Sequence, residues 1–155
     1  MDKEMEKILV AFDGLEESKK ALSIALKLAS FFDSHVTILN VAGQSIVPMV
    51  PSSISSHVGE SQGTIYPLPE HMKDMMVKEA IKILSETKED IESVWNKLDF
   101  AIVFGDPASE IIKESQKSYD LIVIGYRSVH SPIMSLGNVA EKVVKNASCS
   151  VLVIR

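Results

Sequence analysis

The chain lacks most features that would assign it to a specialised class of protein. Its 155 residues include one cysteine, Cys149, which excludes an intramolecular disulfide. No stretch approaches the ~20 uninterrupted apolar residues needed to cross a bilayer, and the charged start of the chain is unlike a secretory signal. The formal net charge of -5 argues against a nucleic-acid-binding surface. The sequence therefore predicts a cytoplasmic protein with no membrane and no nucleic-acid partner.

Several catalytic motifs are also missing. The chain has no G-x-x-x-x-G-K-[ST] phosphate loop, no G-x-G-x-x-G turn, no G-x-S-x-G elbow and no H-E-x-x-H pair. Its four histidines are scattered without the spacing of metal ligands, and one cysteine cannot anchor a thiolate zinc site. These absences argue against common nucleotide hydrolases, serine hydrolases and protein-held transition metals. The chain is predicted not to be an enzyme.

Hydrophobic residues follow two alternating periods along the whole chain. Strand-like runs rich in apolar residues occupy residues 8–12, 36–41, 100–104, 121–124 and 150–154, and the continuous run over 8–12 is typical of a strand buried on both faces. Between these runs, apolar residues recur every three or four positions, which predicts helices over 16–32, 70–95, 107–118 and 138–146. Such alternation predicts a three-layer α/β fold, a doubly wound parallel sheet covered by helices, with residues 1–155 forming one domain.

Two connections interrupt this pattern. Residues 42–70 are rich in proline, serine and glycine and are expected to form a long loop, which either has no role or serves as a lid or contact surface. The turn before the 107–118 helix is short. There, Asp106 is expected to cap the helix and Pro107 to occupy its first position.

Candidate ligand-binding residues lie just after the strands, where open parallel sheets bind their ligands. Asp13 follows the first strand and can either bind ribose hydroxyls or a phosphate-bridging divalent ion, or cap the helix that starts near Glu16. Arg127 follows the fourth strand and can either contact phosphate or lie in solvent. Both alternatives remain open for each residue.

The segment from Gly125 to Asn138 resembles an anion site. An apolar run ends at Gly125, where a ligand can approach the backbone, and a helix opens near Gly137 and Asn138 with amides that lack partners. The alternative is purely structural: Gly125 turns the chain, and Asn138 forms a capping box with Glu141.

Several motifs in order resemble the universal stress proteins of the UspA superfamily. They span nearly the whole chain and comprise Lys7 to Gly14 with Glu17 to Leu22, Gly105 to Pro107, Asp120 to Gly125, and Gly137 to Val144 with Ser150 to Ile154. The resemblance implies a Rossmann-like sheet of five parallel strands in the order 3-2-1-4-5, as in adenine-nucleotide alpha-hydrolases. It also implies a cleft between the first and fourth strands and a homodimer through Val151, Leu152, Val153 and Ile154.

The resemblance further implies an adenine-nucleotide site. ATP-binding members carry G-x-x-G, nine residues, then G-[ST], and Gly125 and Gly137 match the first and last glycines. Asp13 matches the ribose-contacting aspartate, and Val41 matches the position whose backbone meets adenine.

The phosphate half of the motif departs from the family in three places. Ser128 replaces the second glycine, eight residues separate it from Gly137, and Asn138 replaces the serine or threonine. We therefore expect a stress-response regulatory protein that binds ATP, ADP or AMP weakly, with Mg²⁺ held only through the nucleotide. The alternative is a dimerisation or interaction module of the same family that binds no nucleotide.

Overall fold

The computed structural model describes residues 5–43, 70–91, 93–126 and 137–155. Five strands pair in parallel to form one sheet in the order β3-β2-β1-β4-β5, which confirms the expected topology. The strands are β1 (Lys7–Ala11), β2 (His35–Gly43), β3 (Leu98–Gly105), β4 (Leu121–Gly125) and β5 (Ser150–Ile154). Most of the predicted loop over 42–70, and the candidate residues Arg127 and Ser128, lie outside the described residues.

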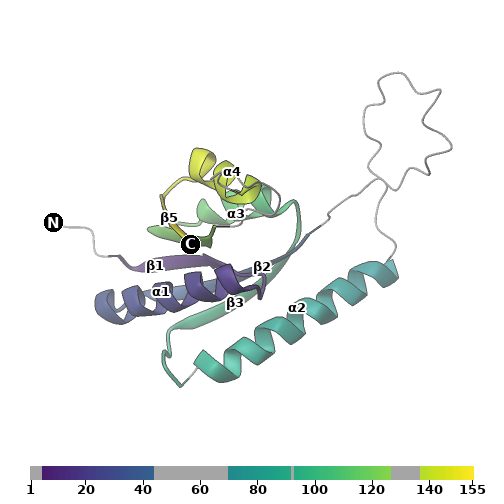
Figure 1. Cartoon of the computed structure of the whole chain (residues 1–155), viewed down its shortest axis with the longest axis horizontal. Helices are drawn as coiled ribbons and strands as arrows, with labels where there is room; N and C mark the ends of the chain where they lie inside the picture. The colour runs from purple at the N-terminus through teal and green to yellow at the C-terminus, as the bar shows by residue number, and fades with distance from the viewer. Residues whose placement is uncertain (1–4, 44–69, 92, 127–136) are drawn as a thin grey trace.

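Four helices cover the two faces of the sheet (Figure 1). The helices α1 (Glu16–Phe32) and α2 (Glu70–Ile91) lie on one face, and α3 (Pro107–Ser115) and α4 (Asn138–Asn146) lie on the other. None of the helices in the described part of the chain is long and apolar enough to cross a membrane. The three-layer α/β architecture is thus the one predicted from the alternating periods.

The central strand β1 supplies both hydrophobic cores. Ile8 and Val10 belong to the cluster under α1 and α2, whereas Leu9 belongs to the cluster under α3 and α4. This alternation follows from the period of two in a strand, which points successive side chains to opposite faces. All three residues are fully buried, so the apolar run reflects a strand that is covered on both sides.

A carboxylate fixes the start of β1 against β4. The Asp120 side chain accepts hydrogen bonds from the backbone N–H groups of Glu6 and Lys7, at 2.9 and 3.0 Å. These contacts join the two strands at the end opposite to the candidate site. They explain why an aspartate directly precedes the apolar run of β4.

Two predicted helices end earlier than expected. The helix predicted over 70–95 ends at Ile91, and Trp95 lies in the following turn, where its indole N–H donates to the Ser34 carbonyl at 3.1 Å. The helix predicted to reach Ser118 ends at Ser115, because Ser118 adopts a left-handed conformation with φ of 66°. β5 matches the predicted 150–154, and the limits of the other strands lie within two residues of the predicted ones.

The predicted cap of α3 is confirmed. Asp106 precedes the helix in an extended conformation, and its carboxylate accepts hydrogen bonds from the Ser109 N–H at 3.0 Å and the Ser109 hydroxyl at 2.7 Å. Pro107 occupies the start of the helix, where its missing N–H costs nothing. The two hydrogen bonds from Ser109 lower the pKa of Asp106 below its ordinary value of 3.8.

Replacing Asp106 with alanine is expected to lower the free energy of unfolding by about 0.5 to 2 kcal/mol at pH 7, because the cap is lost. Since the folded-state pKa is lowered, the cap contributes fully above the unfolded value and is lost as the pH falls through the folded value. Urea unfolding at pH 7 and at lower pH measures both effects. The matched control Asp106→Asn should retain most of the cap without its pH dependence, and an alanine variant as stable as the wild type at pH 7 would contradict the assignment.

Candidate functional site

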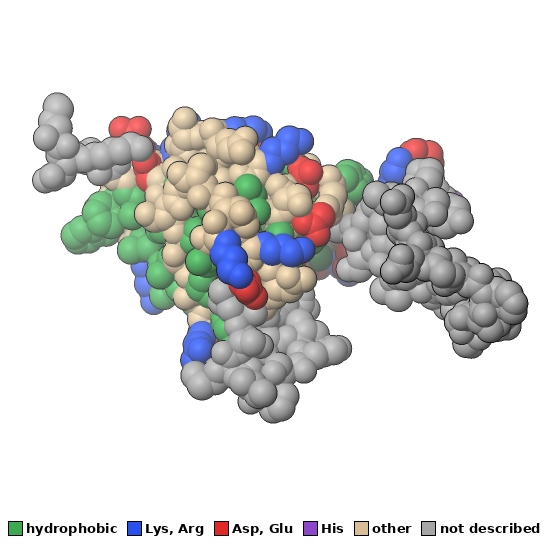
Figure 2. Space-filling view, turned by 90° about the horizontal axis from the view of Figure 1, so that it is seen from above, with side chains coloured by type: hydrophobic (Ala, Val, Ile, Leu, Met, Phe, Trp, Pro, Cys, Tyr) green, Lys and Arg blue, Asp and Glu red, His purple; other side chains and the backbone are tan. Residues whose placement is uncertain are grey.

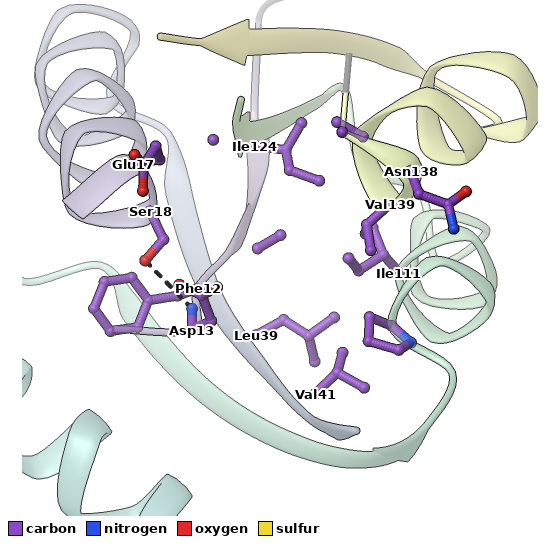
Figure 3. A pocket seen from close by; sticks show the side chains of 15 residues that line it. Phe12, Asp13, Glu17, Ser18, Leu39, Val41, Ile111, Ile124, Asn138 and Val139 are labelled. Carbon is purple, nitrogen blue, oxygen red and sulfur yellow. Dashed lines mark hydrogen bonds between the residues drawn. The ribbon is translucent and has the colours of Figure 1, made fainter. Parts of the chain in front are cut away.

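A cavity of about 410 Å³ lies at the carboxyl ends of the strands (Figure 3). Its lining includes five of the residues singled out from the sequence, namely Asp13, Val41, Gly125, Gly137 and Asn138. These residues come from the ends of β1, β2 and β4 and from the start of α4. The fold therefore brings together positions that are up to about 125 residues apart in the sequence.

Asp13 lies in a tight turn between β1 and α1. Its Oδ1 accepts the N–H of Leu15 at 3.0 Å, and Gly14 between them has a φ of 82°, which favours glycine. The capping alternative for Asp13 is corrected, because Leu15 is the N-cap residue of α1 and makes no side-chain cap. Asp13 instead stabilises the turn that precedes the helix.

Ser18 completes this turn. Its hydroxyl donates to the Leu15 carbonyl at 2.9 Å and accepts the Asp13 N–H at 3.4 Å, as Figure 3 shows for the second contact. The side chain is buried and lines the cavity. The sequence analysis missed this residue, because a serine within the first turn of a helix gives no signal for a bond to the preceding loop.

Asn40 is a second residue that the sequence analysis missed. It is only 6% exposed within β2, and its amide donates to the Phe12 carbonyl at 2.9 Å. The Phe12 N–H in turn donates to the Leu39 carbonyl at 2.9 Å. Asn40 therefore holds the chain immediately before Asp13, and the available signal was an amide side chain inside a mostly apolar strand.

Gly125 is required by packing against α1. A Cβ atom at this position would lie 2.7 Å from the backbone carbon of Glu17 and 2.8 Å from its Cβ. No such approach is tolerated, so the end of β4 and the first turn of α1 can meet only if residue 125 is glycine. The close contact between the end of β4 and α1 is therefore a further reason for glycine at this position.

The start of α4 differs from the expected capping box. Gly137 is the N-cap residue, Asn138 is the first residue of the helix, and no side chain caps this end. Glu141 instead pairs with Lys145 at 2.6 Å, and this hydrogen bond lowers the pKa of Glu141. Because the helix begins one residue earlier than a capping box requires, Glu141 is its fourth residue and not its third.

The cavity wall has an apolar part and a polar part. Leu39, Val41, Ile111 and Val139 supply the apolar part, which suits a flat ring. The polar residues of the lining are Asp13, Glu17, Ser18 and Asn138, and the start of α4 has no side-chain cap. In the described part of the chain, no group of three or more His, Cys, Asp or Glu side chains is placed to hold a metal ion.

Comparison with known proteins places this geometry in a family context. The model of the universal stress protein family matches residues 4–155. The universal stress protein YxiE of Bacillus subtilis is 34% identical, over 96% of this chain and 98% of its own length. The solved structure of UspA from Lactobacillus plantarum is 22% identical, covers 99% of this chain and 100% of its own, and superposes with a TM-score of 0.75.

Two of the similar solved structures are described as nucleotide complexes. A family member from Arabidopsis thaliana, solved with AMP bound, is 21% identical, covers 96% of this chain and 90% of its own, and has a TM-score of 0.64. The protein from Archaeoglobus fulgidus in complex with dAMP is 18% identical, covers 99% and 100% of the two chains, and has a TM-score of 0.67. At these identities the likeness concerns the fold alone.

Proposed function

Because the chain belongs to the universal stress protein family, we propose that it is a non-catalytic stress-response regulator that binds an adenine nucleotide weakly in the cavity at the strand ends. The observation that carries the proposal is the convergence of Asp13, Val41, Gly125, Gly137 and Asn138 on one cavity. The AMP and dAMP complexes of proteins with the same fold support the choice of ligand. Weak binding follows from the departures at Ser128, Asn138 and the loop length.

The adenosine half of the ligand fits the residues present. An apolar wall that includes Leu39 and Val41 can cover the base, and the Asp13 carboxylate can accept a hydrogen bond from a ribose hydroxyl. The volume of about 410 Å³ is within the ~300 to 1,000 Å³ typical of small-molecule sites.

The phosphate half has a weaker basis. The first amides of α4 lack intrahelical partners and carry the positive end of the helix dipole, which favours an anion. Asn138 can add a hydrogen bond but no charge. The described lining contains no lysine or arginine, so affinity is expected to come mainly from the adenosine half.

Calorimetric titration with ATP, ADP and AMP, each with and without Mg²⁺, tests the proposal. We expect a dissociation constant on the order of 0.1 to 1 mM for at least one of them, or about -4 to -5.5 kcal/mol. Replacing Asp13 with alanine should weaken binding roughly tenfold, because a hydrogen bond to the ligand is lost. Asp74→Ala on the exposed side of α2 is the control, and the absence of heat with any nucleotide at millimolar concentration would overturn the proposal.

A second candidate function is assembly through β5. This strand lies at one edge of the sheet and pairs only with β4 among the described strands. Val151, Leu152, Val153 and Ile154 are each partly exposed along it, and an apolar edge favours pairing with another strand. Equilibrium sedimentation distinguishes a homodimer from a monomer, and a monomer at all concentrations would exclude this candidate.

A further inference from the structure

Glu17 is an acidic residue of the cavity lining. It lies in the first turn of α1, it is partly buried, and its backbone is in contact with the end of β4 at Gly125. Figure 3 shows Glu17 on α1 on one side of the cavity and Asn138 on α4 on the opposite side. Glu16, its neighbour in the same turn, is 79% exposed in its side chain and does not line the cavity.

The charge of Glu17 is not neutralised by a described cation. Lys19 lies on the same helix, but its Nζ pairs with Oε1 of Glu16 at 3.5 Å. Lys142 on α4 acts on Asp106, outside the lining. Within residues 5–43, 70–91, 93–126 and 137–155, no salt bridge involves Glu17.

The described lining of the cavity contains no lysine or arginine that could offset this charge. On the face shown in Figure 2, lysine and arginine side chains lie next to aspartate and glutamate side chains and are not gathered in one basic patch. Two lysines of the described chain are paired with nearby glutamates, Lys145 with Glu141 within α4 and Lys117, just after α3, with Glu114. An anionic ligand in the cavity is therefore attracted by the start of α4 and repelled by Glu17 across it.

We propose that Glu17 selects the ligand by its charge, so that the cavity takes an adenine nucleoside or nucleoside monophosphate in preference to the triphosphate. The inference rests on the proposed adenine-nucleotide site and adds its specificity determinant. Each further phosphate adds negative charge to the same cavity, where partial burial strengthens the repulsion compared with water. Uncharged adenosine experiences none of this repulsion.

Titration of adenosine, AMP and ATP in Mg²⁺-free, low-salt buffer tests the inference. The wild type is expected to bind adenosine or AMP at least about tenfold more tightly than ATP. Glu17→Gln keeps the size of the side chain and should tighten ATP binding about tenfold while adenosine binding stays within about twofold. Glu17→Lys should tighten ATP binding further, because it reverses the charge.

Glu16→Gln is the matched control, since it removes the same charge from the same helix turn but outside the cavity. It should leave the ratio of adenosine to ATP affinity unchanged. Added salt should change that ratio more in the wild type than in Glu17→Gln, a difference that a merely structural role of Glu17 would not produce. If the ligands bind but Glu17→Gln changes the affinities for adenosine and ATP equally, or changes neither, the inference about Glu17 is wrong and the proposed function stands. If no variant binds any of the three ligands, the proposed function is wrong as well.

Discussion

Replacing Gly125 with alanine is expected to lower the free energy of unfolding by about 1 to 3 kcal/mol, the usual cost of inserting a group into a packed position. The added methyl would lie 2.7 Å from a backbone carbon and 2.8 Å from a backbone oxygen of Glu17. Neither atom can rotate away as the end of a side chain would, so α1 must shift relative to β4. Thermal unfolding should show a fall of about 2 to 4 °C for each kcal/mol in a domain of this size.

The control for this prediction is Glu17→Ala, which keeps glycine at position 125. It removes an acidic side chain from the first turn of α1 and should cost only about 0.3 to 1 kcal/mol. A combined Gly125→Ala and Glu17→Ala variant should not recover stability, because the backbone atoms of residue 17 remain. Full stability in the Gly125→Ala variant would show that α1 adjusts freely and that packing does not require glycine.

Truncating Ile122 to alanine is expected to cost about 2 to 5 kcal/mol, the range for removing a large side chain from a closed core. Ile122 is 0% exposed in β4, where it pairs with Leu9 of β1 and Val151 of β5. Its neighbours in the cluster under α3 and α4 include Ala140 and Val143, which are held by their own helix. A cavity at this position has little opportunity to collapse.

Urea unfolding of a graded series measures this effect. Ile122→Val, which removes one methylene, should cost about 0.5 to 1.5 kcal/mol. Val144 on α4 is 47% exposed, so Val144→Ala should change the free energy of unfolding by less than about 0.5 kcal/mol. An Ile122→Ala cost no larger than that of Ile122→Val would contradict the packing described for β4.

The order of elements was predictable because it depends on local periods. Ile8, Val10 and their equivalents in other strands form apolar runs, while α1 carries its apolar residues three and four positions apart, and α1 indeed covers the predicted 16–32. The strand order itself followed from the family resemblance, since periodicity alone does not determine which strands become neighbours. Both predictions are confirmed.

Element ends and the polar part of the site were harder to predict because distant contacts determine them. The indole N–H of Trp95 donates a hydrogen bond to the Ser34 carbonyl, 61 positions away. The spacing of apolar residues in the helix could not predict this contact. Asn40 reaches the Phe12 carbonyl across 28 positions. The place of Glu17 in the cavity lining could not be predicted from the sequence either. The helix dipole favours a glutamate in the first turn whether or not a cavity lies beside it.

The position of β1 has a consequence for how the chain folds. All four strand pairings are parallel. No two paired strands are joined by a hairpin, so each pairing forms only after the connecting segment has crossed over the sheet. Asp120 and Lys7, which bond at the junction of β1 and β4, are 113 positions apart. During synthesis β2 emerges long before β4, so one edge of the apolar strand β1 has no β4 to pair with until the chain is nearly complete.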